Sequence, residues 1–295
     1  MDLRKFKLVS VLLLLAALLL LTFGYVRRTK SGEQFPQSAV EDLAALMEKG
    51  GILITPDQIP LRRETRPVYV CRTADGETAK KFAAAVCASS CANVNLTENG
   101  FLFRTEDGSL SEIHTDLKIN ITLNRTFASV DTLPNDEKIQ SIEKRLRGLF
   151  TAQYADRDVT LVGVKRIYTL LQDGKLYTCF ALTLDGTEIY RAALTAATDG
   201  EGQLLSLSGD GYLLPLERRV FSQQTDQLNI LATELQAHKT SGAGTRTVAS
   251  VSECYVPSLS SDGTLLRFLP AWKITYTDHG ESVYDTVNKG KYVIP

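Results

Sequence analysis

The chain has 295 residues, a formal net charge of −1 and 44% hydrophobic residues, which is the composition of an ordinary folded protein. Beyond residue 30 the acidic residues exceed the basic ones by about six, and a modestly acidic surface disfavours binding to nucleic acid through bulk electrostatics. The length is sufficient for two domains, each with its own hydrophobic core.

The first predicted element is a transmembrane helix. Residues 8–26, between Lys7 and Arg27, contain no charge and are rich in leucine. As a helix this stretch would span roughly 28 Å, close to the thickness of the hydrocarbon core of a bilayer. We therefore expect a single-pass protein of the cell membrane, with residues 1–7 in the cytoplasm, a linker at 27–37 and an extracytoplasmic remainder.

This predicted helix would have the lipid bilayer as a partner, and its small residues Ala16, Ala17 and Gly24 mark a face on which a second helix could pack. A cleaved secretory signal peptide is the alternative. Such a peptide has a shorter apolar core of about 7–15 residues and a small-residue cleavage site, which the segment 22–28 does not provide. The retained helix is therefore the prediction.

Residues 38–133 predict an α+β domain. A capping box, Ser38-Ala-Val-Glu41, opens its first helix, and residues 77–88 predict a second. Farther along, apolar residues alternate strictly from Leu117 to Leu123, which is typical of a half-buried antiparallel strand.

Residues 134–295 predict a second domain that is built from two repeats, 134–215 and 220–295. Each repeat begins with an amphipathic helix, near Asn135 and near Ser222, and continues as a meander of strands with Asp-Gly or similar turns. The first strands share the spacing of three apolar residues: Leu161, Val164 and Tyr168 in one repeat, Val248, Val251 and Tyr255 in the other. A chance alignment of two strand-rich segments is the alternative.

Catalytic motifs are absent from the sequence. It contains no Gly-x-Ser-x-Gly elbow, no Gly-rich phosphate loop and no His-Glu-x-x-His, and its three histidines are far apart. Ser141-Ile-Glu-Lys144 matches the Ser-x-x-Lys of penicillin-interacting enzymes, but both residues lie opposite the apolar stripe of their predicted helix. We therefore predict no catalytic residue, no cofactor and no enzymatic activity.

The five cysteines, an odd number, include one close pair, Cys87 and Cys91. Two small buried thiols and a disulfide both remain possible for this pair, whereas a metal site is disfavoured because no second pair of ligands accompanies it. The single tryptophan, Trp272, could anchor a protein interface or lie in the core.

Three C-terminal segments are similar to the YycI/YycH proteins, most closely to YycI. These segments are Val220-Phe-Ser-Gln-Gln224, Val248-Ala-Ser-Val-Ser-Glu-Cys-Tyr255, and Pro270-Ala-Trp272 followed by Tyr284-Asp-Thr-Val-Asn288-Lys-Gly290. The resemblance implies a membrane-anchored, non-enzymatic regulator of the cell-wall sensor histidine kinase of the WalK/WalR (YycG/YycF) two-component system in Gram-positive bacteria. A YycH-like protein would be a second partner. Cys254 departs from the family pattern, which has glycine there.

The predicted fold class is α+β: a single N-terminal transmembrane helix followed by helix-plus-antiparallel-meander modules that resemble PepSY domains. The predicted function is regulation of a sensor kinase through protein–protein contacts. An anchored PepSY-like module of the cell envelope that binds a ligand or inhibits a protease is the alternative, and a wall-acting enzyme that uses Ser141 is a third reading.

Overall fold

A computed structural model describes residues 34–61, 65–72, 75–97, 100–114, 118–152, 162–210, 216–260 and 264–292. The described residues group into two compact units. Unit 1 takes them from the segments up to 65, 225–252 and 274–282, and unit 2 takes them from 66–224, 253–273 and 283–292. Strands β12 (Arg246–Leu259) and β13 (Leu265–Tyr276) contribute residues to both units.

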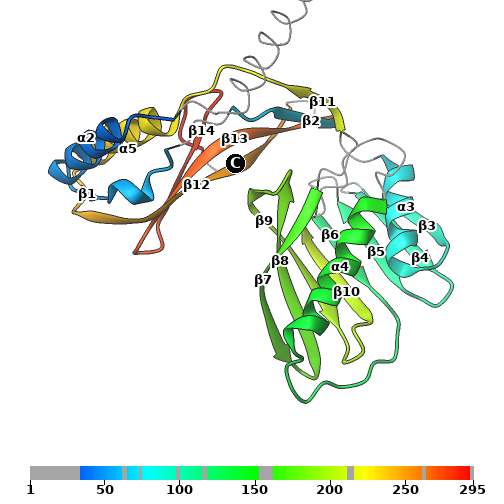
Figure 1. Cartoon of the computed structure of the whole chain (residues 1–295). Helices are drawn as coiled ribbons and strands as arrows, with labels where there is room; N and C mark the ends of the chain where they lie inside the picture. The colour runs from blue at the N-terminus through cyan, green and yellow to red at the C-terminus, as the bar shows by residue number, and fades with distance from the viewer. Residues whose placement is uncertain are drawn as a thin grey trace, which may run out of the picture. The chain divides into compact units, whose positions relative to one another are not determined.

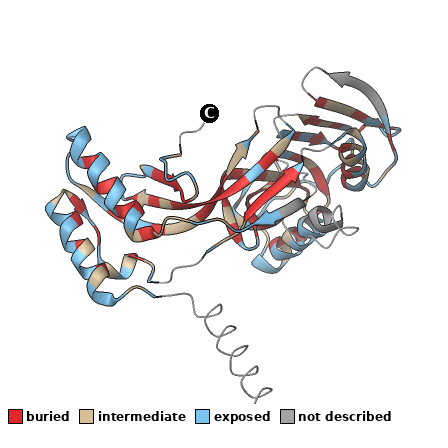
Figure 2. Ribbon diagram, turned by 90° about the horizontal axis from the view of Figure 1, so that it is seen from above, coloured by how far each residue is buried: buried red, intermediate tan, exposed pale blue. Residues whose placement is uncertain are grey.

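Unit 1 is organised around two helices. Its elements are α2 (Gln37–Lys49), β1 (Ile52–Leu53), the 3-10 helix η1 (Pro56–Gln58), α5 (Gln227–Ser241) and parts of β12 and β13. Helix α2 begins at Gln37 with Pro36 at the N-cap, so the predicted capping box is not formed. Val40, Ala44 and Met47 give α2 one buried face, and its opposite face is exposed (Figure 2).

The two helices of unit 1 approach each other closely at the end of α2. A Cβ atom on Gly50 would lie 2.3 Å from Cδ1 of Leu235 on α5, and one on Gly51 would lie 3.2 Å from Nε2 of His238. Gly51 also has a φ of +91°, which glycine adopts without steric cost. Gly50 and Gly51 therefore end the helix and also allow α5 to pack closely against it.

Unit 2 contains a continuous run of eight antiparallel strands, in the order β7-β8-β9-β10-β6-β5-β4-β3. Their bounds are β3 (Cys91–Thr97), β4 (Gly100–Thr105), β5 (Leu110–His114), β6 (Lys118–Thr122), β7 (Val162–Gln172), β8 (Lys175–Leu184), β9 (Thr187–Thr198) and β10 (Leu204–Asp210). The turn between β7 and β8 is Asp173-Gly174, and the positive φ of both residues confirms it as one of the Asp-Gly turns that the sequence predicts for the first repeat.

Helices α3 (Gly76–Cys87) and α4 (Asp136–Ala152) lie on one face of this run of strands (Figure 1). Asp75 caps α3 by accepting a hydrogen bond from the amide of Thr78 at 2.8 Å. The helix predicted near Asn135 is confirmed as α4, and the amide of Lys138 donates to the Asn135 side chain at 3.1 Å.

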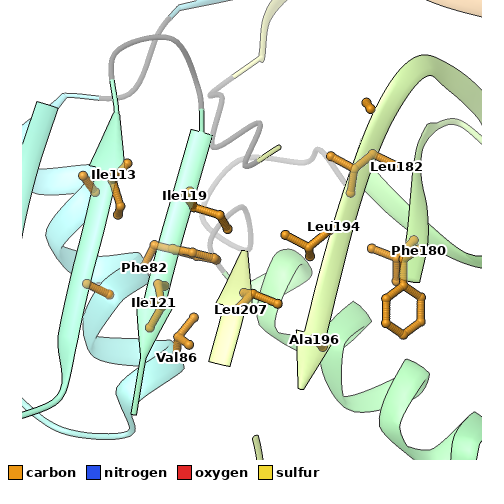
Figure 3. Close-up of a cluster of buried hydrophobic side chains, with 14 of the residues drawn as sticks. Phe82, Val86, Ile113, Ile119, Ile121, Phe180, Leu182, Leu194, Ala196 and Leu207 are labelled. Carbon is orange, nitrogen blue, oxygen red and sulfur yellow. The ribbon is translucent and has the colours of Figure 1, made fainter. Parts of the chain in front are cut away.

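The core of unit 2 crosses the seam between β6 and β10 without interruption. Leu207 pairs with Ile121 across the seam, and both side chains are fully buried. Figure 3 shows these residues with Phe82 of α3 on one side and Leu194 of β9 on the other. Burying a large apolar side chain contributes about 1.5–3 kcal/mol, so this shared core stabilises the pairing of two strands that are distant in the sequence.

The remaining strands complete a fourteen-stranded mixed sheet. They are β11 (Leu216–Val220), β2 (Val68–Arg72) and β14 (Glu281–Asp285), with β1, β12 and β13. The order β11-β2-β13-β12-β9 joins these strands to the antiparallel run, through a single parallel pairing of Tyr255 with Ile189.

The predicted fold class, an α+β chain of separate helix-plus-meander modules behind a transmembrane helix, is wrong. Strands dominate the described chain, and they are hydrogen bonded in one large mixed sheet. The physical reason lies at the strand edges. A free edge leaves backbone N–H and C=O groups unpaired, and β10 satisfies such groups by pairing with β6, across the predicted border between modules.

The predicted transmembrane helix at 8–26 lies outside the described residues. None of the helices that the structure describes is long and apolar enough to cross a membrane. The longest of them, α4, has 17 residues and charged side chains, whereas a spanning helix needs about 20 predominantly apolar residues. We therefore withdraw the prediction of a single-pass membrane protein with a cytoplasmic N-terminus and extracytoplasmic domains.

Candidate functional site

A buried carboxyl group occupies the interior of unit 1. Glu234 on α5 is only 4% exposed, and its Oε1 accepts hydrogen bonds from the Tyr276 hydroxyl at 2.6 Å and from the Ser282 hydroxyl at 3.0 Å. Burial raises the pKa of Tyr276, and the hydrogen bond to Glu234 raises it further. These contacts connect α5 to β13 and β14, so the carboxyl group has a structural role.

The ring of Tyr276 is also covered by a cation. The guanidinium of Arg246 lies 3.6 Å from the ring centroid. The same guanidinium donates to both carboxylate oxygens of Asp278, at 3.0 and 3.1 Å from Nη2, in the turn between β13 and β14. Arg246 and Asp278 therefore fix the end of a hairpin, and their charges are used within the fold.

A second polar cluster lies in unit 2. Arg66 donates from Nε to Glu253 Oε2 at 2.6 Å and from Nη1 to Thr187 Oγ1 at 2.7 Å. Close by, the Tyr255 hydroxyl donates to the carbonyl of Pro67 at 3.3 Å. Burial raises the pKa of Tyr255, so its hydroxyl stays protonated at neutral pH. This cluster joins three segments of the chain, through Arg66, Thr187 and Glu253.

The residues singled out from the sequence do not converge on one site. Trp272 lies on β13 and is 5% exposed, while Ala16, Ala17 and Gly24 lie outside the described residues. Ser141 lies on the exposed face of α4, as the sequence predicts. Within the part of the chain that the structure describes, no three His, Cys, Asp or Glu side chains are grouped so that they could hold a metal ion.

The Cys87 and Cys91 thiols are both free and buried. The Cys87 thiol lies 3.4 Å from the hydroxyl of Ser111. Burial, followed by the neighbouring Cys87, raises the pKa of Cys91 to about 11. Since the thiolate is the nucleophilic form, Cys91 is poorly suited to nucleophilic chemistry at neutral pH.

Strand β7 presents an exposed apolar surface in unit 2. Ile167, Tyr168 and Leu170 are 56%, 52% and 38% exposed. Among the described strands β7 pairs with β8 alone, so its other edge is unpaired over residues 162–172. We call these three side chains, with the unpaired backbone beside them, the β7 surface.

Two of these side chains face away from the helices of unit 2. Arg166, which is paired with Phe180 in the register, points to the helix side and forms an ion pair with Asp136 of α4 at 2.9 Å. Tyr168 and Leu170 are opposite Cys179 and Tyr177, on the other face of the sheet. The alternation of a strand therefore turns their apolar groups outward.

A bulge explains why this surface was missed in the sequence. The register between β7 and β8 shifts between Arg166 and Tyr168, which leaves Ile167 without a partner on β8. In the sequence, Tyr168 stands as one of three apolar residues whose spacing matches that of Val248, Val251 and Tyr255. The signal that could have indicated the bulge is the sequence Ile167-Tyr-Thr-Leu-Leu171, in which four of the five residues are apolar and do not alternate with polar residues.

Comparison with known proteins gives no assignment. No family model matches the chain, and no curated protein matches it. A solved structure that it resembles is the crystal structure of an uncharacterized protein from Eubacterium rectale ATCC 33656, with 12% identity over 79% of this chain and 86% of that chain and a TM-score of 0.43. A likeness this weak supports no conclusion about function. The resemblance to the YycI/YycH proteins stays a sequence-based hypothesis.

Proposed function

We propose that this chain is a non-enzymatic regulatory protein that acts by binding another protein, and that the β7 surface is where it binds. The observation that carries this proposal is the group of three large apolar side chains, Ile167, Tyr168 and Leu170, on an unpaired strand edge. A strand edge with exposed apolar residues can cause a protein to aggregate. The presence of such an edge in this protein therefore favours a role in binding.

The chemistry of the polar clusters supports a binding role over catalysis. Glu234 and Arg66 each hold neighbouring segments together through short hydrogen bonds. Such groups contribute to the stability of the fold. The β7 surface, by contrast, is exposed and can contact a partner. On the resemblance to the YycI/YycH proteins, the partner that we propose is a sensor histidine kinase or a YycH-like protein.

The size of the expected binding contribution follows from exposure. Fully burying an aliphatic or aromatic side chain contributes about 1.5–3 kcal/mol, so burying three side chains that are about half exposed contributes roughly 3 kcal/mol. That corresponds to about a hundredfold in affinity. Loss of these contacts should therefore weaken the binding of a partner enough to be measured.

Site-specific photo-crosslinking tests the proposal. A photoreactive phenylalanine analogue replaces Tyr168 in the full-length chain, expressed in the cells from which the protein comes. We expect a crosslink to one identified protein that disappears when Leu170→Lys is introduced as well. The matched control carries the analogue at Leu46 of α2, which is 49% exposed. Equal crosslinking from both positions, or none from Tyr168, would overturn the proposal.

A further inference from the structure

The β7 edge offers a segment of regular geometry beside its bulge. From Tyr168 to Gln172 the strand pairs residue by residue with Cys179 to Lys175, without a shift in register. Along an antiparallel strand alternate backbone N–H and C=O groups point away from the partner strand, and on an edge strand these groups can pair with an added strand. The regular segment is five residues long, which suits a short extended peptide.

The side chains of this segment specify what an added strand should present. Tyr168 and Leu170 lie on the outer face, so alternate residues of an added strand would lie beside them on that face. Apolar residues are favoured there. Lys165, exposed and opposite Ala181, lies on the same face at the bulged end of the strand. A carboxylate at the corresponding end of an added strand would meet this ammonium group.

The added strand could come from an extended peptide of a partner protein or from β7 of a second copy of this chain, and charge distinguishes these two occupants. Strand β7 contains Lys165 and Arg166 and no acidic residue, so a second copy pairing through β7 would bring no carboxylate of its own β7 to Lys165. The pairing is also short, whereas stable dimers bury roughly 1,200–2,000 Å² in total. A weak, reversible complex with an extended peptide can form with a smaller buried area than a stable dimer requires. The charge and the limited area both favour a peptide over a second copy.

We infer that the β7 edge binds an extended segment of a partner protein by strand addition, with apolar residues at alternate positions and a carboxylate at the end that meets Lys165. The inference rests on the proposed function and gives it a binding mode. The Arg166 guanidinium contributes to the positive field at the same end, although its ion pair with Asp136 reduces that contribution.

Synthetic peptides test the binding mode with the full-length chain. The acidic probe is fluorescein-labelled Glu-Thr-Val-Thr-Val-Thr-Glu, in which the valines and both terminal glutamates lie on one face, so that either strand direction is served. A basic probe has lysine in place of glutamate. Two further probes keep the acidic sequence and carry N-methyl groups on alternate residues, in the two possible registers, so that one of them loses the amides that face β7.

Fluorescence anisotropy should show the acidic probe binding more tightly than the basic probe, by about fivefold at low salt. Lys165→Glu should reverse that preference, while Lys144→Glu, at an exposed position on the helix side of the same unit, should leave it unchanged. One N-methylated probe should lose binding and the other should retain it. Amide hydrogen exchange should slow along 168–172 when the acidic probe binds.

Four results would overturn the inference. Equal binding of both N-methylated probes would exclude backbone pairing, and an unchanged preference in Lys165→Glu would remove the charge assignment. A dimer of the full-length chain in sedimentation that Leu170→Lys dissociates would identify a second copy as the occupant. A partner crosslinked at Tyr168, together with no binding of any probe, would contradict strand addition and leave the proposed function standing. The absence of any crosslink would contradict the proposed function itself.

Discussion

The buried contact between Tyr276 and Glu234 gives the sharpest test of how unit 1 is held together. Tyr276→Phe removes one hydroxyl and leaves the ring, with the Arg246 guanidinium still stacked on it. The lost hydroxyl donates at 2.6 Å to a carboxyl group that is 4% exposed. Water cannot readily replace the donor at such a depth, so the cost of the substitution reports the contact directly.

The expected magnitude follows from the remaining partners. A hydrogen bond to a charged group contributes about 1.5–3 kcal/mol to stability. Ser282 continues to donate to the same oxygen at 3.0 Å, which places the expected loss for Tyr276→Phe near 2 kcal/mol. Tyr292→Phe is the matched control. Its hydroxyl donates to the neutral carbonyl of Pro257 at 2.9 Å, so we expect a loss of about 1 kcal/mol.

Urea unfolding of the full-length chain, followed by circular dichroism, measures these losses as shifts in midpoint at constant slope. A double-mutant cycle with Glu234→Gln isolates the contact, and we expect a coupling energy of at least about 1 kcal/mol between Tyr276 and Glu234. A loss below about 0.5 kcal/mol for Tyr276→Phe, or additive effects in the cycle, would refute the reasoning that this contact links the helix to the sheet.

Three further predictions concern other parts of the fold. Burial raises the pKa values of Tyr255 and Tyr276 above the ordinary value of 10.0 for tyrosine. The unfolded chain therefore releases protons first, and stability should fall as pH rises above about 10 by up to 1.4 kcal/mol per unit for each tyrosine, as urea midpoints at several pH values would show. At pH 8 a pKa of about 11 leaves Cys91 about 0.1% thiolate, so alkylation of the native protein should be slow and should accelerate on unfolding, measured by mass spectrometry. Gly209→Ala, whose Cβ would lie 2.3 Å from a β9 backbone oxygen at a φ of +127°, should cost more than 2 kcal/mol, whereas Gly186→Ala, in open space at a φ of +79°, should cost about 1 kcal/mol in the same assay.

Local structure was the part that the sequence predicted well. The helix expected near Asn135 begins at Asp136, and the turn at Asp173-Gly174 has the positive φ values that a tight hairpin requires. These features depend on neighbouring residues, whose preferences are visible in the sequence itself. The predictions of this helix and this turn were therefore confirmed, whereas the capping box predicted at Ser38 was wrong because α2 begins one residue earlier, at Gln37.

Pairings between distant segments could not be predicted. Alternation at Ile119 and Ile121 indicates a half-buried strand, but it does not indicate that Leu207 lies opposite, because every alternating strand has the same pattern. The amphipathic helix predicted near Ser222 is α5, which begins at Gln227, but the burial of Glu234 and His238 on its inner face was not predicted. Polar residues on a buried helix face reduce the difference in hydrophobicity between the two faces of the helix, and the periodic pattern becomes harder to recognise.

The candidate site escaped the sequence analysis for a related reason. Apolar residues at a strand predict burial by default, and only the tertiary structure shows that β7 is an edge. The bulge at Ile167 then turns Tyr168 and Leu170 to the open face. A sequence contains no direct record of which strand ends a sheet, so the β7 surface required the fold.

The central claim is that this protein works by binding a partner through the β7 surface. The most direct test is the affinity of the full-length chain for the protein crosslinked at Tyr168, measured for the wild type, for Leu170→Lys and for Leu46→Lys. The account predicts at least a tenfold loss for Leu170→Lys and no change for Leu46→Lys. Unchanged affinity in Leu170→Lys, with its urea midpoint also unchanged, would contradict it.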